Sequence, residues 1–394
     1  MKRLSLITCG LVLSSSFVFA NEVKTFDDAF KSGKASGSLG LYGKHIDYSG
    51  TQPNYDGTKQ VGKAGYLNGY GVLGYETASL YGFSAKTEFR GNLDLGEINN
   101  NDRKNSDLAP FENNALMTEG YLKYANDAFF VSAGRQAIDL EWLSDYHEAV
   151  VAGITAVPDT TIVLGWTKRK AESTAELSED FWKINENKGA YVADIKYTGF
   201  TGIELNPYYY SAPDLVDWYG LKTTFSTDYF GLIAHYAQTN ADSKFLIDTD
   251  GDNITDTQMK DGSIAHIELN TEIDGFTAAV GYIKTDKDAG AGGMDLAGDN
   301  ISPFEDGNHN YDPDAKTVYG SLGYTISDVT FGALYGQTKY DTNRIKENEL
   351  NLSASYAFSE SLATSLLYVN VDTETSVNGE PDYDKWIATI EYTF

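Results

Sequence analysis

Polar and apolar positions alternate with a period of two in many short segments of this chain. The final ten residues, KWIATIEYTF, put most of their apolar side chains on one parity: Trp386, Ala388, Ile390, Tyr392 and Phe394. Only Ile387 interrupts the polar parity. Because successive side chains of a β-strand point to opposite faces, this segment predicts a strand with one apolar and one polar face.

Segments of the same kind recur along most of the chain. We count eighteen of them, and sixteen is the alternative count. The segments cover residues 36–48, 65–78, 82–95, 115–126, 128–138, 148–157, 160–170, 188–198, 200–211, 216–226, 229–239, 263–273, 275–285, 316–326, 329–340, 347–358, 361–373 and 384–394.

The connections between these segments tend to alternate in length. Short ones such as 199–200 and 274–275 are followed by long ones such as 240–262 and 286–315. Tight turns at one rim and long loops at the other are typical of one all-β fold, the transmembrane antiparallel up-and-down β-barrel, with short periplasmic turns and long extracellular loops. We therefore expect residues 36–394 to form such a barrel.

Charged residues on the polar parity indicate what the barrel contains. Lys86, Glu88 and Arg90 follow one another on the polar face of a single segment. A packed core would hold them only at a cost of several kcal/mol for each unpaired ion. Eighteen strands enclose a wide lumen, whereas eight are filled by their own side chains. The polar faces therefore predict a water-filled channel.

The N-terminal residues have a different character. Lys2 and Arg3 precede an apolar stretch that closes on SSSFVFA, which is typical of a secretory signal peptide spanning residues 1–20. Cys9 lies inside it, and an early lipoprotein cysteine is the alternative interpretation. Residues 21–35 are expected to form a short periplasmic segment, in which Thr25 and Asp28 have the spacing of a helix cap.

Charge and motifs exclude several functions. The chain has 57 acidic residues against 30 basic ones, so the phosphates of nucleic acids would repel it. No run of 18 apolar residues follows position 20, which excludes membrane-spanning helices. The five histidines lack metal-like spacing, and no nucleophile or phosphate-binding motif occurs. We therefore expect no enzymatic activity.

Several stretches of the chain resemble bacterial outer-membrane porins of the porin D (Opr) family, and are similar to the major porins of Campylobacter-like bacteria. They are residues 28–50, residues 131–171 with the motif AGRQ, residues 203–225 and the terminal strand. The resemblance implies an eighteen-stranded barrel for small hydrophilic solutes, narrowed by a third outer loop that folds inward near residues 139–147. Relatives selective for carboxylates carry a ladder of arginines, whereas residues 21–394 contain only five.

Opposed charges are expected at this constriction. Acids on an inward loop that face charged groups of the wall create a transverse field, which sorts ions by charge. The loop candidates are Asp139, Glu141, Asp145 and Glu148, and the wall candidates are Lys86, Glu88, Arg90 and Arg135. The alternative is that the loop caps the rim and its acids are solvated.

A second acidic stretch, DTDGDNITD at residues 248–256, has the odd spacing of a looped calcium site. The candidate ligands are Asp248, Asp250, Asp252 and Asp256. Asn253 stands where such loops carry glycine, and Met259 where they carry glutamate. A solvated acidic loop is therefore the favoured interpretation, with weakly bound Ca²⁺ as the alternative. No other cofactor is expected.

These patterns predict a porin with a mild cation preference. The alternatives are a substrate-specific channel for small nutrients and a structural or adhesive barrel that transports nothing. Expected partners are outer-membrane lipid, lipopolysaccharide and small solutes, with a homotrimer as the candidate assembly. The last strand should pair with the first, and the resemblance implies that Tyr392 and Phe394 form the signal read by the outer-membrane assembly machinery.

Overall fold

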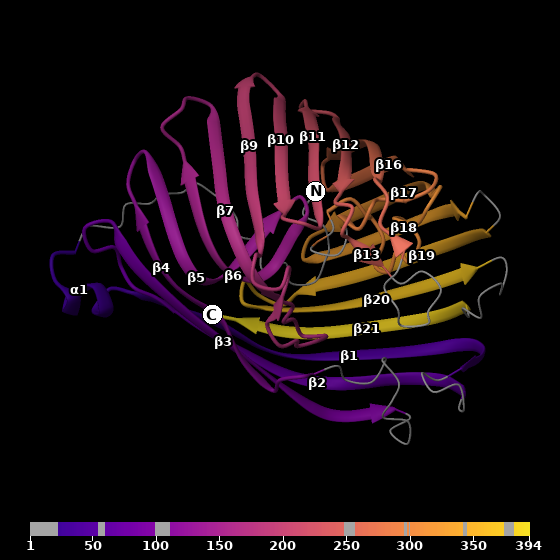
Figure 1. The fold of residues 1–394 in the computed structure, drawn as a ribbon. Coiled ribbons are helices and arrows are strands. Elements are labelled where there is room, and N and C mark those ends of the chain that lie inside the picture. Colours follow the sequence, from indigo (N-terminus) through magenta and orange to yellow (C-terminus); the bar gives the residue numbers. More distant parts are fainter. Residues whose placement is uncertain are drawn as a thin grey trace.

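Strands follow one another around a ring in the computed structural model of this protein (Figure 1). The structure describes residues 23–53, 60–98, 111–247, 257–294, 298, 300–341, 345–373 and 382–394. The expected signal peptide, residues 1–20, lies outside these ranges. Among the described residues, no helix has the length and apolar character needed to cross a membrane.

Eighteen of the strands form the wall. They are β1 (Lys34–Pro53), β2 (Gln60–Glu76), β3 (Phe83–Ile98), β4 (Ala115–Ala125), β5 (Phe129–Leu140), β6 (Leu143–Ile154), β7 (Thr160–Ala171), β9 (Ala190–Phe200), β10 (Ile203–Ala212), β11 (Val216–Ser226), β12 (Gly231–Ala241), β15 (Ser263–Ile273), β16 (Phe276–Thr285), β17 (Lys316–Ile326), β18 (Val329–Tyr340), β19 (Ile345–Ala357), β20 (Leu362–Thr373) and β21 (Asp382–Thr393).

The remaining elements are short. Helix α1 (Phe26–Lys31) precedes the wall, and Thr25 caps it by accepting a hydrogen bond from the backbone N–H of Asp28 at 3.1 Å, as the sequence predicts. Strand β8 (Trp182–Lys183) pairs only with β7. Strands β13 (Leu246–Ile247) and β14 (Thr257–Gln258) form a small separate hairpin.

The wall closes where the two ends of the chain meet. Strand β1 pairs antiparallel with β21 from Ser38 opposite Thr393 to Ser49 opposite Asp382. At the end of this ladder, Gly37 and Phe394 exchange two backbone hydrogen bonds of 3.0 Å. The predicted count of eighteen strands and the predicted closing pair are therefore confirmed. Among the described strands, this closing pair joins the two edges that an open sheet would expose to the lipid.

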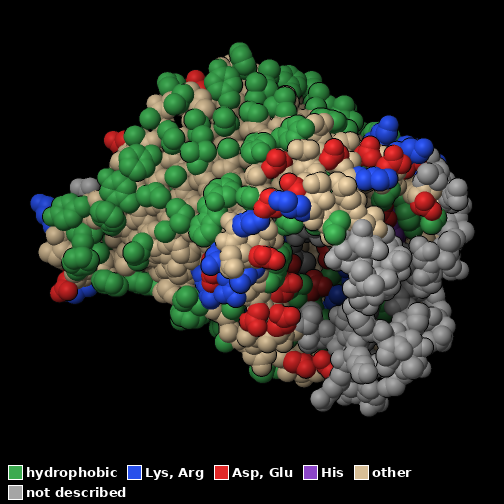
Figure 2. All heavy atoms as spheres, in the orientation of Figure 1, with side chains coloured by type: hydrophobic (Ala, Val, Ile, Leu, Met, Phe, Trp, Pro, Cys, Tyr) green, Lys and Arg blue, Asp and Glu red, His purple; other side chains and the backbone are tan. Residues whose placement is uncertain are grey.

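The two faces of the wall have opposite character. Trp386 is 45% exposed on the outside of β21, whereas its neighbour Lys385 is only 4% exposed because it points into the barrel. Figure 2 shows hydrophobic side chains spread over the outer wall, with charged ones gathered around the hollow. Ile387 is the exception that the sequence indicated, and it packs inside the barrel beside Tyr42 and Val369.

One hairpin leaves the wall and enters the lumen. The ladder between β4 and β5 ends at Arg135, whereas the ladder between β5 and β6 continues to Leu140 and Leu143. Gly134 has φ +133 at this departure point, and a side chain there would collide with the carbonyl oxygen of Gly120. The hairpin tip therefore pairs only with itself over its last residues.

The prediction that residues 139–147 form a loop is wrong. Strand β6 begins at Leu143 rather than at residue 148, and only Glu141 and Trp142 form the turn. Apolar and polar residues do not alternate in this hairpin, because other parts of the chain inside the lumen pack against both of its faces. Ala137, Ile138 and Leu140 are all buried.

Replacing the glycine at the departure point tests how the hairpin is inserted. Gly134→Ala should destabilise the folded barrel by about 1–3 kcal/mol, because the backbone is in a region that side chains avoid and the new Cβ would meet the Gly120 carbonyl. The midpoint of thermal unfolding measures the effect. Gly320→Ala is the matched control, since its Cβ would meet its nearest atom at 3.6 Å. Equal midpoints for the two variants would contradict this account of Gly134.

Candidate functional site

Three segments narrow the lumen. The first is the tip of the β5–β6 hairpin, where Trp142 Nε1 donates a hydrogen bond of 2.7 Å to the hydroxyl of Tyr208 on β10. Glu141 beside it accepts one of 2.7 Å from Lys222 on β11. The tip therefore reaches a part of the wall far from its own neighbours, β4 and β7.

The second segment is the connection from β7 to β9, residues 172–189. Its tip folds back onto the inner face of β1 and β2. Tyr66 donates a hydrogen bond of 2.7 Å to the carbonyl of Glu176, and Asn68 donates one of 2.7 Å to the carbonyl of Ala175. The Lys44 ammonium and the Glu176 carboxylate form an ion pair of 3.0 Å.

The third segment is the connection from β16 to β17, residues 286–315. It contacts the hairpin, because Asn300 donates a hydrogen bond of 2.6 Å to the carbonyl of Leu140. Ile301 joins Trp142 and Met294 in one buried cluster. The sequence marked this stretch as an outer loop, and the structure places much of it inside the barrel.

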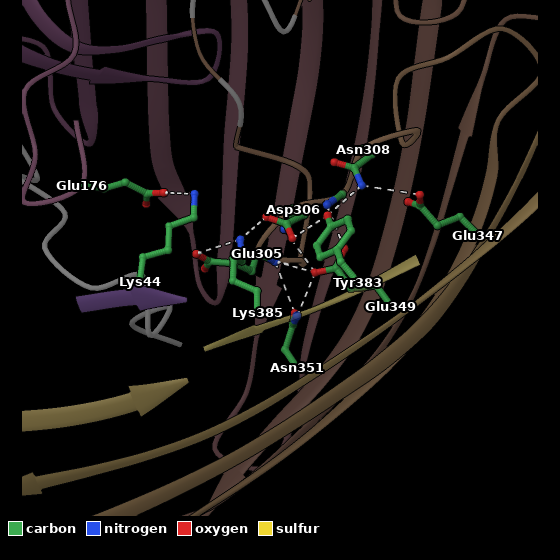
Figure 3. Close-up of polar contacts among 11 residues, drawn as sticks. Lys44, Glu176, Glu305, Asp306, Asn308, Glu347, Glu349, Asn351, Tyr383 and Lys385 are labelled. Carbon is green, nitrogen blue, oxygen red and sulfur yellow. Dashed lines mark hydrogen bonds and ion pairs between the residues drawn. The ribbon is translucent and has the colours of Figure 1, made fainter. Parts of the chain in front are cut away.

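A carboxylate on the wall holds this third segment in place. Glu349 of β19 accepts hydrogen bonds from three consecutive backbone N–H groups, those of Glu305 and Asp306 at 3.1 Å and that of Gly307 at 2.8 Å (Figure 3). Asn351 donates a further bond of 2.8 Å to the same carboxylate. Successive N–H groups that converge in this way form a nest, which suits an anion.

Lys385 of β21 binds the same turn from the other side. Its ammonium contacts the Asp306 carboxylate and lies 3.9 Å from that of Glu305 (Figure 3). Tyr383 donates a hydrogen bond of 2.8 Å to Asp306. The closing strand of the barrel therefore also holds the third segment in place inside the lumen.

The charges in this region do not balance. We call the following set the acidic cluster: Glu176, Glu305, Asp306, Glu347 and Glu349, with Lys44 and Lys385 as its cations. Among the described residues, five carboxylates thus lie around two ammonium groups, and the imidazole of His309 lies 3.6 Å from Glu347. The cluster carries net negative charge where the two inserted loops approach β1, β19 and β21 (Figure 3).

The protonation of the two loop glutamates follows from their surroundings. Burial raises the pKa of Glu305 to about 7, and the neighbouring carboxylates Asp306, Glu176 and Glu349 reinforce this shift against the opposing effect of Lys385. Burial alone would also raise the pKa of Glu176, but the ammonium of Lys44 holds it below its ordinary value. Glu305 therefore gains a proton near neutral pH.

The wall residues expected at the constriction do point inward. Lys86 contacts Glu119 and lies 3.5 Å from Glu88. Arg90 is 2% exposed, with its guanidinium 5.6 Å from the ring centre of Tyr70. Lys86 and Arg90 are engaged with neighbouring strands of the wall, and Glu88 accepts a hydrogen bond of 3.4 Å from Tyr146 on the inserted hairpin.

The hairpin acids have local basic partners. Glu148 pairs with Arg135 across the hairpin at 3.1 Å, and Asp145 pairs with Lys170 of β7 at 3.2 Å. Glu141 forms an ion pair with Lys222, and Asp139 is exposed. Among the described residues, the only expected loop acid that pairs with an expected wall base is therefore Glu148, which pairs with Arg135.

The acidic cluster itself was missed from the sequence. The alternation in residues 347–358 and 384–394 puts Glu349 and Lys385 on the polar parity, which is the signal that the sequence offers. Nothing in the Gly- and Asp-rich sequence of residues 286–315 marks Glu305 and Asp306 as lumen residues, because the return of a loop depends on contacts with distant strands.

The expected calcium ligands lie outside the described residues. They are Asp248, Asp250, Asp252 and Asp256. Across the ranges that the structure does describe, no three His, Cys, Asp or Glu side chains are grouped in a way that would hold a metal ion.

Several solved structures from Pseudomonas share this architecture. OccK8 (OprE) of Pseudomonas aeruginosa is 14% identical, with a TM-score of 0.70 over 93% of this chain and 98% of that one. A BenF-like porin from Pseudomonas fluorescens is 13% identical, with a TM-score of 0.73 over 93% and 99% of the two chains. OpdK of Pseudomonas aeruginosa, solved with vanillate, is 14% identical, with a TM-score of 0.66 over 92% and 98%. At these identities, the likeness shows a shared fold.

Sequence comparisons give the family. No curated protein matches the chain significantly. A family model described as "Putative outer membrane protein" matches residues 37–376, which is most of the wall. The chain therefore belongs to this family of outer-membrane proteins, and it is a multi-pass β-barrel of the outer membrane.

Proposed function

We propose that this barrel is a channel for the passive diffusion of small hydrophilic solutes, with a mild preference for cations. The observation that carries the proposal is the acidic cluster, in which five carboxylates surround two ammonium groups inside the lumen. Family and fold support a channel rather than an enzyme.

The physical basis is the field inside a narrow pore. Fixed carboxylates that line a constriction raise the local concentration of cations and repel anions, and low-dielectric walls strengthen this effect. The hairpin acids contribute less, because Lys222, Lys170 and Arg135 neutralise three of them locally. The third segment therefore sets the sign of the selectivity.

A substrate-specific channel is the second candidate. Its support is that solved neighbours of the same fold include OpdK with bound vanillate. The net negative cluster disfavours an anionic solute in this chain, so a specific site here would suit a neutral or cationic one. A structural or adhesive barrel without transport predicts no conductance at all.

The proposed partners follow from the outer wall and its closing strand. Lipid and lipopolysaccharide would cover the apolar outside, and a homotrimer is the proposed assembly. We also propose that the chain is related to the major porins of Campylobacter-like bacteria. Tyr392 and Phe394 are 47% and 52% exposed, with ring centres 6.2 Å apart, which suits recognition by the assembly machinery.

Selectivity measurements test the acidic cluster. In a planar bilayer with a tenfold salt gradient, the wild-type zero-current potential should have the cation-selective sign and stay below the limit of about 59 mV for a perfectly selective pore. Glu305→Gln with Asp306→Asn should move it toward zero, because two carboxylates are neutralised. The matched control is Glu272→Gln with Asp274→Asn at the opposite rim. An unchanged potential in the first pair would refute the role of the cluster, and absence of ohmic steps in wild type would refute the channel.

Cation preference should depend on pH near neutrality. Because the pKa of Glu305 is raised to about 7, its carboxylate gains a proton as the pH falls from about 8 to about 6, and the cluster loses negative charge. The zero-current potential should therefore approach zero over this range. In Glu305→Gln the change should shrink to what remains from Glu172, whose pKa burial and Asp145 also raise to about 7. A Glu305→Gln variant that keeps the full pH dependence would contradict the assignment.

Removing the last residue tests the proposed assembly signal. Deletion of Phe394 should lower the amount of folded barrel in the outer membrane, because the exposed terminal ring and two backbone hydrogen bonds of the seam are lost. The conductance of the molecules that do assemble should remain that of wild type, since Phe394 faces outward. Quantification of surface-exposed protein gives the answer. Wild-type surface levels of the truncated chain would argue against this role.

A further inference from the structure

An arginine on the inner face of β3 is buried without a carboxylate partner. Arg90 is 2% exposed, and its Nε and Nη1 have no hydrogen-bond partner among the described residues. Its guanidinium carbon lies 5.6 Å from the centre of the Tyr70 ring, which attracts a cation but accepts no conventional hydrogen bond. Arg135, by contrast, donates two hydrogen bonds of 3.1 Å to Glu148. A buried cation that lacks a counter-charge is costly, so Arg90 requires an explanation.

The carboxylates in this part of the lumen are engaged by other groups. Glu88 precedes Arg90 by two residues on the same face of β3, and its carboxylate lies 3.5 Å from the ammonium of Lys86. The carboxylate of Glu391 accepts a hydrogen bond from the hydroxyl of Tyr70. Neither acid forms an ion pair with Arg90 in the described part of the chain. The wall therefore leaves the charge of Arg90 uncompensated.

The tip of the second inserted segment covers the neighbouring residue of β3, Asn92. Asn68 of β2 donates one hydrogen bond of 3.0 Å to Oδ1 of Asn92 and another of 2.7 Å to the carbonyl of Ala175 in that tip. Nδ2 of Asn92 is buried and has no partner within the described ranges. Asn92 therefore has a saturated acceptor and a free donor under the segment.

The same segment also covers Arg90 and brings further polar groups. Phe181 packs in one buried cluster with Leu116, which stands opposite Arg90 on β4. Ser178 lies between the tip and Phe181, and it pairs with Ser173 in an isolated β-bridge. Both serine hydroxyls are buried, and neither has a hydrogen-bond partner in the parts of the chain that the structure describes.

The unpartnered atoms share one chemical property. They are Nε and Nη1 of Arg90, Nδ2 of Asn92 and the hydroxyls of Ser173 and Ser178, and all five are able to donate a hydrogen bond. Water would satisfy these donors but would leave the positive charge without a partner. A ligand that accepts hydrogen bonds and carries negative charge satisfies both requirements.

We propose that these residues bind one small inorganic anion, which holds the second segment against β3. The site is enclosed, because Asn92, Ser173 and Ser178 are 4%, 2% and 1% exposed. An anion held there is part of the folded wall rather than a solute in transit, and larger organic anions do not fit under the segment. The inference goes beyond the proposed function, since it depends neither on conduction nor on ion selectivity.

Direct binding measurements on the refolded protein test the proposal. The protein in a non-ionic detergent is dialysed into sodium gluconate, whose anion is too large for the site. Equilibrium dialysis with radiolabelled phosphate, and separately with radiolabelled chloride, should show saturable binding of one anion per chain. Preference for phosphate would identify an oxyanion, and preference for chloride a halide. No saturable binding of either by the folded wild type would overturn the proposal.

Two variants of β3 separate an anion site from a purely structural role. Arg90→Met removes the charge and keeps an apolar side chain, so it should bind no anion, and in gluconate it should unfold at or above the wild-type temperature. Asn92→Asp keeps the acceptor for Asn68 and adds a carboxylate beside Arg90. It should also bind no anion, and it should unfold above the wild-type temperature in gluconate because the counter-charge is now part of the chain.

A variant of the segment and a control complete the test. Ser178→Ala should weaken anion binding by about tenfold, since one hydrogen bond to a charged ligand is lost. Lys222→Met is the control, because it removes a lumen cation that already pairs with Glu141 at 2.7 Å, and it should bind the anion as wild type does. Equal loss of binding in Lys222→Met would show general attraction to the lumen and overturn the proposal.

Folding of each variant is checked by its far-ultraviolet circular dichroism, which does not depend on conduction. Wild-type anion binding by folded Arg90→Met would overturn the proposal. If Arg90→Met does not fold, Asn92→Asp decides alone, and its binding of phosphate or chloride at the wild-type level would overturn the proposal.

Discussion

The need to pair every backbone group within the lipid governs this structure. A wall that has no edge satisfies that need, and the ladder between β1 and β21 removes the last edge. Closure in turn forces each strand to present one face to lipid and one to the lumen. The charged residues of the wall strands then have one membrane-depth location open to them at low cost, which is the interior of the barrel.

The interior is organised around the same closing strand. Lys385 points inward from β21 and contacts Asp306, while Glu349 from β19 binds the N–H groups of the same turn. A loop rich in glycine and aspartate has little apolar surface with which to fix itself. Charge-assisted hydrogen bonds to the wall provide the fixation instead. Under the proposed function, the groups that position the loop would therefore also set the sign of the field in the pore.

Sequence reasoning worked where one rule governs a residue. The period of two placed Lys86, Glu88 and Lys385 on the inward face, because each wall strand has lipid on one side and water on the other. The rule failed after Gly134, where the β5–β6 hairpin is surrounded on both faces and the strand was expected to resume only at residue 148. The rule makes no prediction for Glu305 and Glu176, which lie in loops. Partners far away in the sequence decide how these loops return into the barrel. Glu349 is more than forty residues from Glu305, and Lys44 is more than a hundred residues from Glu176.

The proposed cation preference requires Asp306 to lie in the conducting path. Cys9 is the only cysteine in the sequence, so an Asp306→Cys variant of residues 21–394 carries a single reactive thiol. Addition of a positively charged thiol reagent to open channels in a planar bilayer should reduce the single-channel current and the cation preference together. Glu272→Cys at the opposite rim should respond to neither. Current and preference that stay unchanged after complete modification of Cys at position 306 would contradict the account.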